Sequence, residues 1–214
     1  LHLSYHDSLT RVHNRRYYEE NLGKYDTPEH YPLTIVMSDI NGLKLINDAF
    51  GHAAGDKLLI AATKVIRNSC RKTDLIARIG GDEFIIVMPN TSGEDAEKII
   101  DKINKESKKT IIESIQLSIS FGFATKNEKN EDIQEVYRAA EDLMYRVKLL
   151  EIPSMRSGAI ETILNTLYEK DKNSEIHSRI VSEISMKIAV ACGMNRQEVS
   201  EVRTAGLLHD IGKI

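Results

Sequence analysis

Three acidic side chains stand where predicted strands end. Asp39 closes an apolar, β-branched segment over residues 33–40, and the neighbours Asp82 and Glu83 lie between two later strand-like segments. Ligands bind at strand ends in α/β sheets, so these carboxylates meet if the later turn lies beside the first strand. Clustered carboxylates repel one another unless a cation neutralises them, and hard oxygen ligands suit Mg²⁺ or Mn²⁺. The pattern predicts a two-metal site that activates an attacking hydroxyl and stabilises a leaving pyrophosphate.

Two glycines precede the acidic pair. Gly80 and Gly81 remove Cβ atoms at a point where a nucleotide would have to approach the backbone. The alternative is a solvent-exposed hairpin with acidic turn residues and no ligand. The Gly-Gly-Asp triplet alone does not separate these two interpretations.

The elements that must position these residues alternate between helix and strand up to residue 150. Helices are predicted where apolar residues recur at helical spacing, and strands where β-branched and apolar residues run together or alternate. The predicted helices are 14–22, 43–50, 53–71, 94–108 and 132–150, and the predicted strands are 33–40, 74–79, 83–88 and 115–124. This order predicts an α/β (α+β) domain over residues 1–150, with helices packed on a mixed sheet.

Beyond residue 150 the pattern is helical only. Residues 151–158, with Pro153 and Gly158, are predicted to form a linker. The helices that follow are predicted at 159–169, 174–192 and 197–209, with Gly193 as the C-terminal cap of the second. Residues 159–214 would form a partial all-α bundle, whose apolar faces stay exposed unless something else covers them.

Composition excludes several classes. The 214 residues carry 29 Lys and Arg against 32 Asp and Glu, a net charge of −3, so nothing indicates nucleic-acid binding or an anionic membrane surface. No apolar run is long enough to span a bilayer. The isolated cysteines, Cys70 and Cys192, form no metal or redox motif and suit a reducing compartment such as the bacterial cytoplasm. The chain does not begin with Met, so we expect a longer parent with a sensor or membrane region elsewhere.

Five segments, in order, resemble motifs of the GGDEF family of diguanylate cyclases. Residues 80–84 read Gly-Gly-Asp-Glu-Phe, the signature that names the family. The other matching segments are residues 7–16, 39–56, 117–124 and 139–148. The resemblance covers about residues 5–150 and implies a nucleotidyl-cyclase, palm-like fold.

The resemblance also implies an activity. The family condenses two GTP molecules into cyclic di-GMP with release of two pyrophosphates, at a site formed between two facing subunits. Asp39, Asp82 and the carbonyl of Ile40 would then bind Mg²⁺ or Mn²⁺, two ions per active site. Glu83 would be a second-metal ligand or the base toward the attacking 3′-hydroxyl, which is a poor nucleophile near neutral pH.

Nucleotide contacts follow from the same resemblance. Asn47 and Asp56 would bind the guanine edge, whose donor pair adenine lacks. The implied triphosphate contacts are Lys44, Lys148 and the backbone N–H groups of Gly42 and Leu43. Without the surrounding motif, Asn47 would be interpreted as a capping or surface amide and Lys148 as a solvated helix end.

Arg71 and Asp74 form an Arg-x-x-Asp pattern that ends six residues before Gly80. Many family members carry this pattern there as an inhibitory site for the product. Arginine suits bidentate contact with guanine or phosphate, and aspartate accepts hydrogen bonds from guanine. The alternative is a local ion pair at a helix end.

Four departures from the family pattern stand out. Asn41 replaces a frequent second Asp, Leu43 replaces a usual Phe, and Arg11 occupies a position where Gly is usual. After Lys148 the chain reads Leu-Leu-Glu-Ile instead of the family's Gly-Arg-Asn ending. An expected phosphate-binding Arg is therefore missing. The prediction remains an active cyclase, with weaker GTP binding as one consequence.

The tail resembles the opening of an HD-GYP domain, a family that hydrolyses cyclic di-GMP at a metal centre. His177, His209 and Asp210 would be metal ligands, and Lys213 would lie near the phosphate. The later ligands and the Gly-Tyr-Pro signature are absent from the chain, so we expect no phosphodiesterase activity from this fragment. A parent with both domains would make and break the same messenger.

Two other functions stay open. The first is a catalytically weak GGDEF domain that binds GTP or cyclic di-GMP and regulates an attached HD-GYP phosphodiesterase. The second concerns residues 159–214 alone, which would pair chains through their apolar faces. Formation of cyclic di-GMP from GTP and Mg²⁺ separates the cyclase from the regulator.

Overall fold

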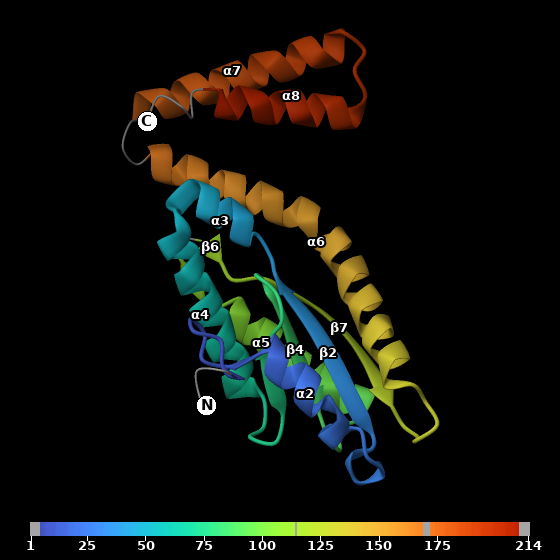
Figure 1. Ribbon diagram of the computed structural model, residues 1–214. Coiled ribbons are helices and arrows are strands. Elements are labelled where there is room, and N and C mark those ends of the chain that lie inside the picture. The colour runs from blue at the N-terminus through green and yellow to red at the C-terminus, as the bar shows by residue number, and fades with distance from the viewer. Residues whose placement is uncertain (1–4, 114, 169–171, 210–214) are drawn as a thin grey trace. The chain divides into compact units, whose positions relative to one another are not determined.

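The computed structural model describes residues 5–113, 115–168 and 172–209 (Figure 1). The chain forms two compact units, Leu1–Met155 and Arg156–Ile214. The first is a mixed α/β unit and the second is helical. This architecture confirms the predicted fold class.

A five-stranded sheet lies at the centre of the first unit. Its order is β1 (His13–Asn14), β3 (Leu75–Arg78), β4 (Glu83–Met88), β2 (Leu33–Ile40) and β7 (Ile119–Lys126). All neighbouring strands are antiparallel except β1 and β3, so the sheet is mixed as predicted. The hairpin turn therefore does lie beside the strand that ends in Asp39.

The predicted strand 115–124 is divided in the structure. Its beginning forms β6 (Ile115–Gln116), which pairs with β5 (Ile111–Ile112) in a separate hairpin, while β7 starts only at Ile119. The backbone between them bonds elsewhere, because Leu117 N–H donates to Thr110 and the Ser118 carbonyl accepts from Asn41 N–H. The alternation in the sequence does not reveal these long-range bonds.

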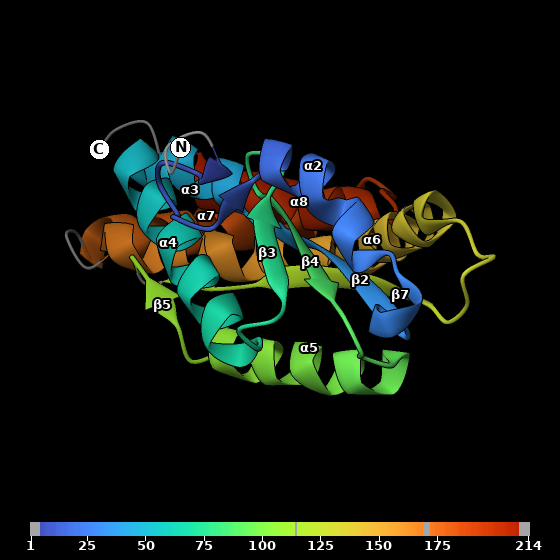
Figure 2. The same ribbon diagram turned by 60° about the horizontal axis from the view of Figure 1, so that its bottom comes forward.

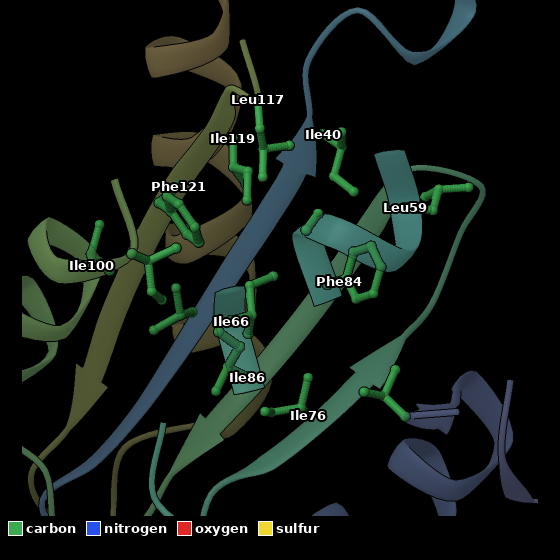
Figure 3. Close-up of a cluster of buried hydrophobic side chains, with 14 of the residues drawn as sticks. Ile40, Leu59, Ile66, Ile76, Phe84, Ile86, Ile100, Leu117, Ile119 and Phe121 are labelled. Atoms are coloured by element: carbon green, nitrogen blue, oxygen red, sulfur yellow. The ribbon is translucent and has the colours of Figure 1, made fainter. Parts of the chain in front are cut away.

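Three helices cover one face of the sheet: α3 (Leu43–Phe50), α4 (His52–Ser69) and α5 (Gly93–Ser107). Every second residue of β4 packs against these helices. Phe84 and Ile86 of β4 lie in one buried cluster with Ile66 of α4 and Ile100 of α5 (Figure 3). Both β4 side chains are fully buried. Burial of such side chains stabilises each by about 1.5–3 kcal/mol, which fixes the sheet against these helices.

The opposite face is covered by α2 (Arg15–Tyr25) and the first part of α6 (Ile133–Tyr168). Figure 2 shows α2 and α5 on opposite sides of the sheet. A short 3₁₀ turn, η1 (Pro28–His30), follows α2. The alternate β2 residues Ile35 and Met37 face this second layer, so Asp39, two residues further on, points toward α2 and α6 as well.

Gly122 of β7 sets how closely α6 approaches the sheet. A Cβ atom at this position would collide with the Met144 N atom and the Ala140 carbonyl oxygen, both in the helix backbone. Neither backbone atom can move without displacing α6. The absence of a side chain at Gly122 therefore brings the helix, and Lys148 on its next turn, against the end of β2.

Residues 151–158, the predicted linker, are helical, which corrects the predicted end of one helix at 150 and start of the next at 159. A single helix, α6, runs through it from Ile133 to Tyr168 and includes the segment predicted as a separate helix from residue 159. A proline in a helix removes one backbone donor, and here Pro153 does not end the helix. The division between the two units falls between Met155 and Arg156, within this segment. The domain boundaries at 150 and 159 stay predictions.

The second unit contains α7 (Lys172–Ala191) and α8 (Arg196–Leu208), which lie side by side (Figure 1). Their contact is made by small residues: Ser182 is buried, and Gly206 lies against its backbone. Gly193, with φ +75°, follows α7 and confirms the predicted cap. Four isoleucines of α7 remain about half exposed, at positions 176, 180, 184 and 188.

No helix in the described ranges is long and apolar enough to cross a membrane.

Candidate active site

Asp39 and Glu83 are direct cross-strand partners. The antiparallel register of β2 and β4 pairs Ile35 with Val87 and Met37 with Ile85, and it ends with Asp39 opposite Glu83. Paired residues of neighbouring strands share a face, so both carboxylates lie on the side covered by α2 and α6. The next backbone bond runs from Ile40 N–H to the carbonyl of Asp82, at 3.0 Å. The sheet thus holds the end of β2 against the Gly-Gly-Asp turn.

Asp39 is buried and ion-paired with Lys148. Its side chain is 5% exposed, and its Oδ2 accepts a 2.6 Å hydrogen bond from the Lys148 amino group on α6. Burial raises the pKa of Asp39 to about 6. The negative charges of Asp82 and Glu83 act in the same direction, while Lys148 opposes them. Lys148 alone therefore does not compensate Asp39 for its burial and for the neighbouring negative charges.

One oxygen atom of Asp39 indicates that a metal ion fits this site. Oδ1 of Asp39 is buried and has no hydrogen-bond partner among the described residues. A buried carboxylate oxygen without a donor suits a hard cation. Within the described ranges, however, no three His, Cys, Asp or Glu side chains form a ready metal cluster. Mg²⁺ is commonly held by one or two carboxylates plus substrate phosphates, so this donor set fits it without such a cluster.

Arg78 holds the signature turn in place. Its Nη2 and Nε donate to the carbonyl of Gly81, at 2.7 and 3.2 Å. The backbone N–H of Gly80 donates to the carbonyl of Glu83 and closes the turn. A Cβ on Gly80 would press on the Glu83 carboxylate, whereas Gly81 has nothing within 4 Å of that position. Gly81 therefore borders open space at the turn, whereas Gly80 borders the Glu83 side chain.

Arg78 also reaches the N-terminal motif. Its Nη1 donates to Asp7 Oδ1 at 3.1 Å, and the same carboxylate oxygen accepts from the N–H and hydroxyl of Thr10. Burial tends to raise the pKa of Asp7, but these bonds outweigh it, so its pKa lies below the ordinary value. Arg11 adopts φ +62°, which explains why glycine suits that position. Sequence reasoning missed Arg78, whose signal is its place two residues before Gly80.

The side-chain amide of Asn41 has a structural role. Its Nδ2 donates to the hydroxyls of Ser118 and Ser120, at 3.1 and 2.8 Å. Asn41 is 5% exposed, and its partners are Ser118, just before β7, and Ser120, within β7. The departure from a frequent Asp at this position therefore supplies donors that join β2 to the 118–120 segment.

Three of the four predicted phosphate contacts lie at the start of α3, and the fourth, Lys148, lies on α6. Gly42 precedes α3 with φ +75°, a conformation that L-residues seldom adopt, and its carbonyl accepts from Ile46 N–H. Leu43 begins the helix and packs against the core, consistent with a packing role for that side chain. Lys44 is exposed on its first turn. These residues directly follow the end of β2.

The predicted guanine residues are brought together by the packing of α3 on α4. A Cβ on Gly55 would collide with Oδ1 of Asn47, so the amide occupies the space left by the missing side chain. Asp56 is the next residue and is exposed. No ion pair or hydrogen bond joins Asn47 or Asp56 to the carboxylates of the β2 end in the described structure. A bound nucleotide would have to bridge the two groups.

Arg71 and Asp74 lie together at the other end of β3 from the signature turn. The Arg71 N–H donates to Asp74 Oδ2 at 2.7 Å, and its Nη1 donates to Thr91 at 3.4 Å. Burial raises the pKa of Asp74. Four strand residues, spanning about 13 Å, separate this pair from the turn. Any inhibitor bound there occupies a place distinct from the carboxylates.

In the helical unit, His177 and His209 face one another. Their Nε2 atoms are 3.2 Å apart, and Nδ1 of His209 lies 2.9 Å from the carbonyl oxygen of Gly206. The structure thus brings together two of the three metal ligands that the resemblance implies in the tail. Asp210 lies outside the described residues, as does Lys213.

Comparison with known proteins agrees with this architecture. Residues 4–151 match the family model for the GGDEF domain of diguanylate cyclases, and residues 175–214 match the HD domain model. Diguanylate cyclase TpbB of Pseudomonas aeruginosa is 36% identical over 155 residues, covering 69% of this chain and 36% of TpbB. Diguanylate cyclase DgcM of Escherichia coli is 30% identical, covering 69% of this chain and 37% of DgcM. The chain thus spans little more than a third of these relatives.

Solved structures show the same fold. The GGDEF domain of TpbB superposes with a TM-score of 0.61 at 35% identity, covering 68% of this chain and 89% of that one. The coiled coil and GGDEF domain of DgcB from Caulobacter crescentus, in complex with cyclic di-GMP, gives 0.64 at 22% identity, covering 69% and 82%. The mixed sheet with its covering helices is thus the fold of a GGDEF domain. The chain belongs to the GGDEF family of diguanylate cyclase domains.

Proposed function

We propose that the first unit condenses two GTP molecules into cyclic di-GMP and two pyrophosphates. The observation that carries the proposal is the register that places Asp39 opposite Glu83, with a buried Asp39 oxygen left without a donor. In this reaction each 3′-oxygen bonds to the α-phosphorus of the other nucleotide, and each α-phosphorus loses pyrophosphate. Two bonds form and two break, and each hydroxyl must lose its proton.

Asp39, Asp82 and the Ile40 carbonyl would hold Mg²⁺ or Mn²⁺, with two ions per site. When bound, the ions lower the pKa of the attacking hydroxyl and neutralise charge on the leaving pyrophosphate. Glu83 would act as a further ligand or accept the proton of the 3′-hydroxyl. Its pairing with Asp39 keeps it within the same group of carboxylates.

Base and phosphates would be bound by separate elements. Asp56 would accept from the ring and exocyclic N–H groups of guanine, with Asn47 beside it. Adenine lacks that donor pair, so this contact would favour GTP over ATP. The N–H groups of Gly42 and Leu43 stand at the start of α3, where backbone donors suit phosphate oxygens. Lys44 and Lys148 would add positive charge.

A second copy of the chain is required by the chemistry. The three carboxylates and the guanine residues form one set per chain, and cyclisation needs two GTP molecules placed head to tail. Two facing copies, each holding one GTP, would supply that arrangement. Product inhibition would act at Arg71 and Asp74, which lie across β3 from the signature turn.

A regulatory function is the second candidate. Leu149 and Leu150 stand where the family's phosphate-binding Arg is expected, and both are exposed. The chain also matches an HD domain over residues 175–214, where the facing pair His177 and His209 would bind metal together with Asp210. A weak cyclase domain attached to such a unit would bind GTP or cyclic di-GMP and regulate it.

One assay separates the two candidates. The purified chain is incubated with GTP and Mg²⁺, and nucleotides are resolved by chromatography, with ATP as a parallel substrate. The cyclase proposal predicts cyclic di-GMP from GTP and no cyclic product from ATP. Binding of GTP without any product, at chain concentrations that form dimers, would favour the regulator and contradict the cyclase.

A further inference from the structure

The domain contains two ion pairs between lysine and aspartate that have the same length but differ in which partner is buried. In each, the lysine amino group lies 2.6 Å from a carboxylate oxygen. The Lys126 side chain is 3% exposed, and that of its partner Asp26 is 21% exposed. The Lys148 side chain is 29% exposed, and that of its partner Asp39 is 5% exposed. The first pair encloses its cation, whereas the second encloses its carboxylate and leaves the cation partly open to solvent.

The two carboxylates also differ in their remaining contacts. In the Asp26 pair, the oxygen that binds Lys126 also accepts from the hydroxyl of Tyr31. In the Asp39 pair, Oδ2 accepts from Lys148, while Oδ1 is buried without a hydrogen-bond partner among the described residues. A buried ion pair stabilises a fold only when further hydrogen bonds satisfy its remaining oxygens. The contact of Lys148 with Asp39 is therefore incomplete as a purely structural ion pair.

Lys148 contacts a carboxylate that would also bind a divalent ion. Asp39 lies opposite Glu83 in the strand register, and the Ile40 N–H bonds to the carbonyl of Asp82. A divalent ion held by Asp39 would lie close to the Lys148 amino group, because both bind the same carboxylate. Two positive charges so close together repel each other strongly at a partly buried site. Metal and lysine would therefore compete for Asp39.

Lys148 is the partner that is able to move. Asp39 belongs to β2, which is hydrogen-bonded to β4 on one side and to β7 on the other. The charge of Lys148 is carried at the end of a flexible four-carbon chain. Because this side chain is partly exposed, its amino group can leave Asp39 without breaking the sheet.

The start of α3 offers the amino group a second partner when a nucleotide binds there. The N–H groups of Gly42 and Leu43, which are proposed to bind phosphate, follow Asp39 after only two residues. A triphosphate carries several negative charges, against the single charge of Asp39. It would therefore draw the ammonium group of Lys148 away from the carboxylate.

We propose that Lys148 is a displaceable counter-ion of Asp39, and that its transfer to the triphosphate couples the binding of metal to the binding of GTP. This inference rests on the proposed function, which assigns the metal to Asp39 and the triphosphate to the start of α3. Without nucleotide, Lys148 lowers the affinity of the chain for a divalent ion. With nucleotide, that competition ends. Since coupling between two ligands is reciprocal, bound metal raises the affinity for GTP by the same factor.

Electron paramagnetic resonance of free Mn²⁺ tests the coupling without turnover. The intact chain is titrated with Mn²⁺, first alone and then with saturating α,β-methylene GTP, and a titration without protein corrects for Mn²⁺ bound by the analogue. Without nucleotide, we expect K148M to bind Mn²⁺ about threefold or more tightly than the wild type. The analogue should then raise Mn²⁺ affinity less in K148M, by a similar factor. The control R146M removes an exposed cation of the same helix and should match the wild type in both titrations.

A second variant and a melting experiment separate charge from folding. Circular dichroism melts verify that each variant is folded, and K148Q, which keeps a polar side chain without the charge, should show the same gain in Mn²⁺ affinity. Failure of both variants to fold would make the ion pair structural and would overturn the proposal. Equal or weaker Mn²⁺ binding by folded K148M and K148Q, without nucleotide, would also overturn it.

The failure of this inference is distinguishable from the failure of the proposed function. If D39N binds Mn²⁺ more weakly than the wild type but K148M does not bind it more tightly, the metal site stands and the counter-ion role of Lys148 is wrong. If D39N and the wild type bind Mn²⁺ equally in the presence of the analogue, the metal is not held by Asp39. Both the inference and the proposed function then fail.

Discussion

The amino group of Lys148 lies 2.6 Å from Oδ2 of Asp39, and the two residues are 109 positions apart in the chain. The contact exists because Gly122 admits the backbone of α6 close to β7, one turn before Lys148. The last helix of the GGDEF domain thus delivers a cation to the end of β2. Lys148 therefore belongs to the candidate active site on geometry as well as on motif.

Replacing Lys148 with Met should lower kcat/KM for GTP by about 10- to 100-fold. One hydrogen bond to a charged group is worth about 1.5–3 kcal/mol, and the variant loses the proposed contact between Lys148 and the triphosphate. Most of the effect should fall on KM. Arg146→Met, two residues earlier on the same helix and exposed, is the matched control. Equal steady-state kinetics in K148M and R146M would remove Lys148 from the substrate site.

Replacing Arg78 with Ala should lower kcat by about tenfold or more, since the Gly81 carbonyl and Asp7 lose their shared donor. Arg78 acts through the turn, so the pH at which the rate is half maximal should not move. Arg16→Ala removes an exposed pair with Glu20 and should cost no more than about 1 kcal/mol and leave kcat unchanged. A wild-type kcat in R78A would show that the turn needs no such support.

Sequence patterning predicted the two strands that carry the candidate active site. The β-branched segment 33–40 and the apolar run after Glu83 give strands β2 and β4, whose pairing places Asp39 and Glu83 together. The contacts of Arg78 with Asp7, and of Gly122 with α6, were beyond it because each joins segments far apart in the chain. The helical state of residues 151–158 was missed because a proline usually indicates the end of a helix, whereas α6 continues through Pro153.

Replacing Arg71 with Ala should relieve inhibition by added cyclic di-GMP. The guanidinium that would contact product is removed, while the carboxylates beyond β3 are untouched. Initial rates measured at increasing cyclic di-GMP should stay flat in R71A and fall in the wild type. Lys98→Ala, which removes an exposed pair with Asp95, should behave as the wild type. Undiminished inhibition of R71A would remove the product-feedback hypothesis.

Replacing Asp26 with Ala should destabilise the domain by about 3 kcal/mol, because it leaves the buried charge of Lys126 without its ion-pair partner. The Lys126 side chain is 3% exposed and pairs with Asp26 at 2.6 Å, while Tyr31 also donates to Asp26. Chemical denaturation at pH 7 measures the change. Lys57→Ala breaks an exposed pair and should cost no more than about 1 kcal/mol. Equal denaturation midpoints for D26A and K57A would contradict this assignment.

The same pair predicts a pH dependence. Burial tends to raise the pKa of Asp26, but the bonds from Lys126 and Tyr31 lower it below its ordinary value of 3.8. Its stabilising contribution is therefore present above that value and is lost as the pH falls through the lower pKa of the folded chain. Between pH 5 and pH 3, the wild type should lose part of its advantage over D26A. A constant difference down to pH 2 would contradict the pairing.

In the proposed function, Asp39 and the signature turn form one cation site that serves GTP turnover. Electron paramagnetic resonance of Mn²⁺, titrated into the chain with a non-hydrolysable GTP analogue, tests it without requiring catalysis. We predict saturable Mn²⁺ binding to the wild type, at least about tenfold weaker binding to D39N and D82N, and unchanged binding to the control D48N. Equal Mn²⁺ affinity in D39N, D82N and the wild type would contradict the account.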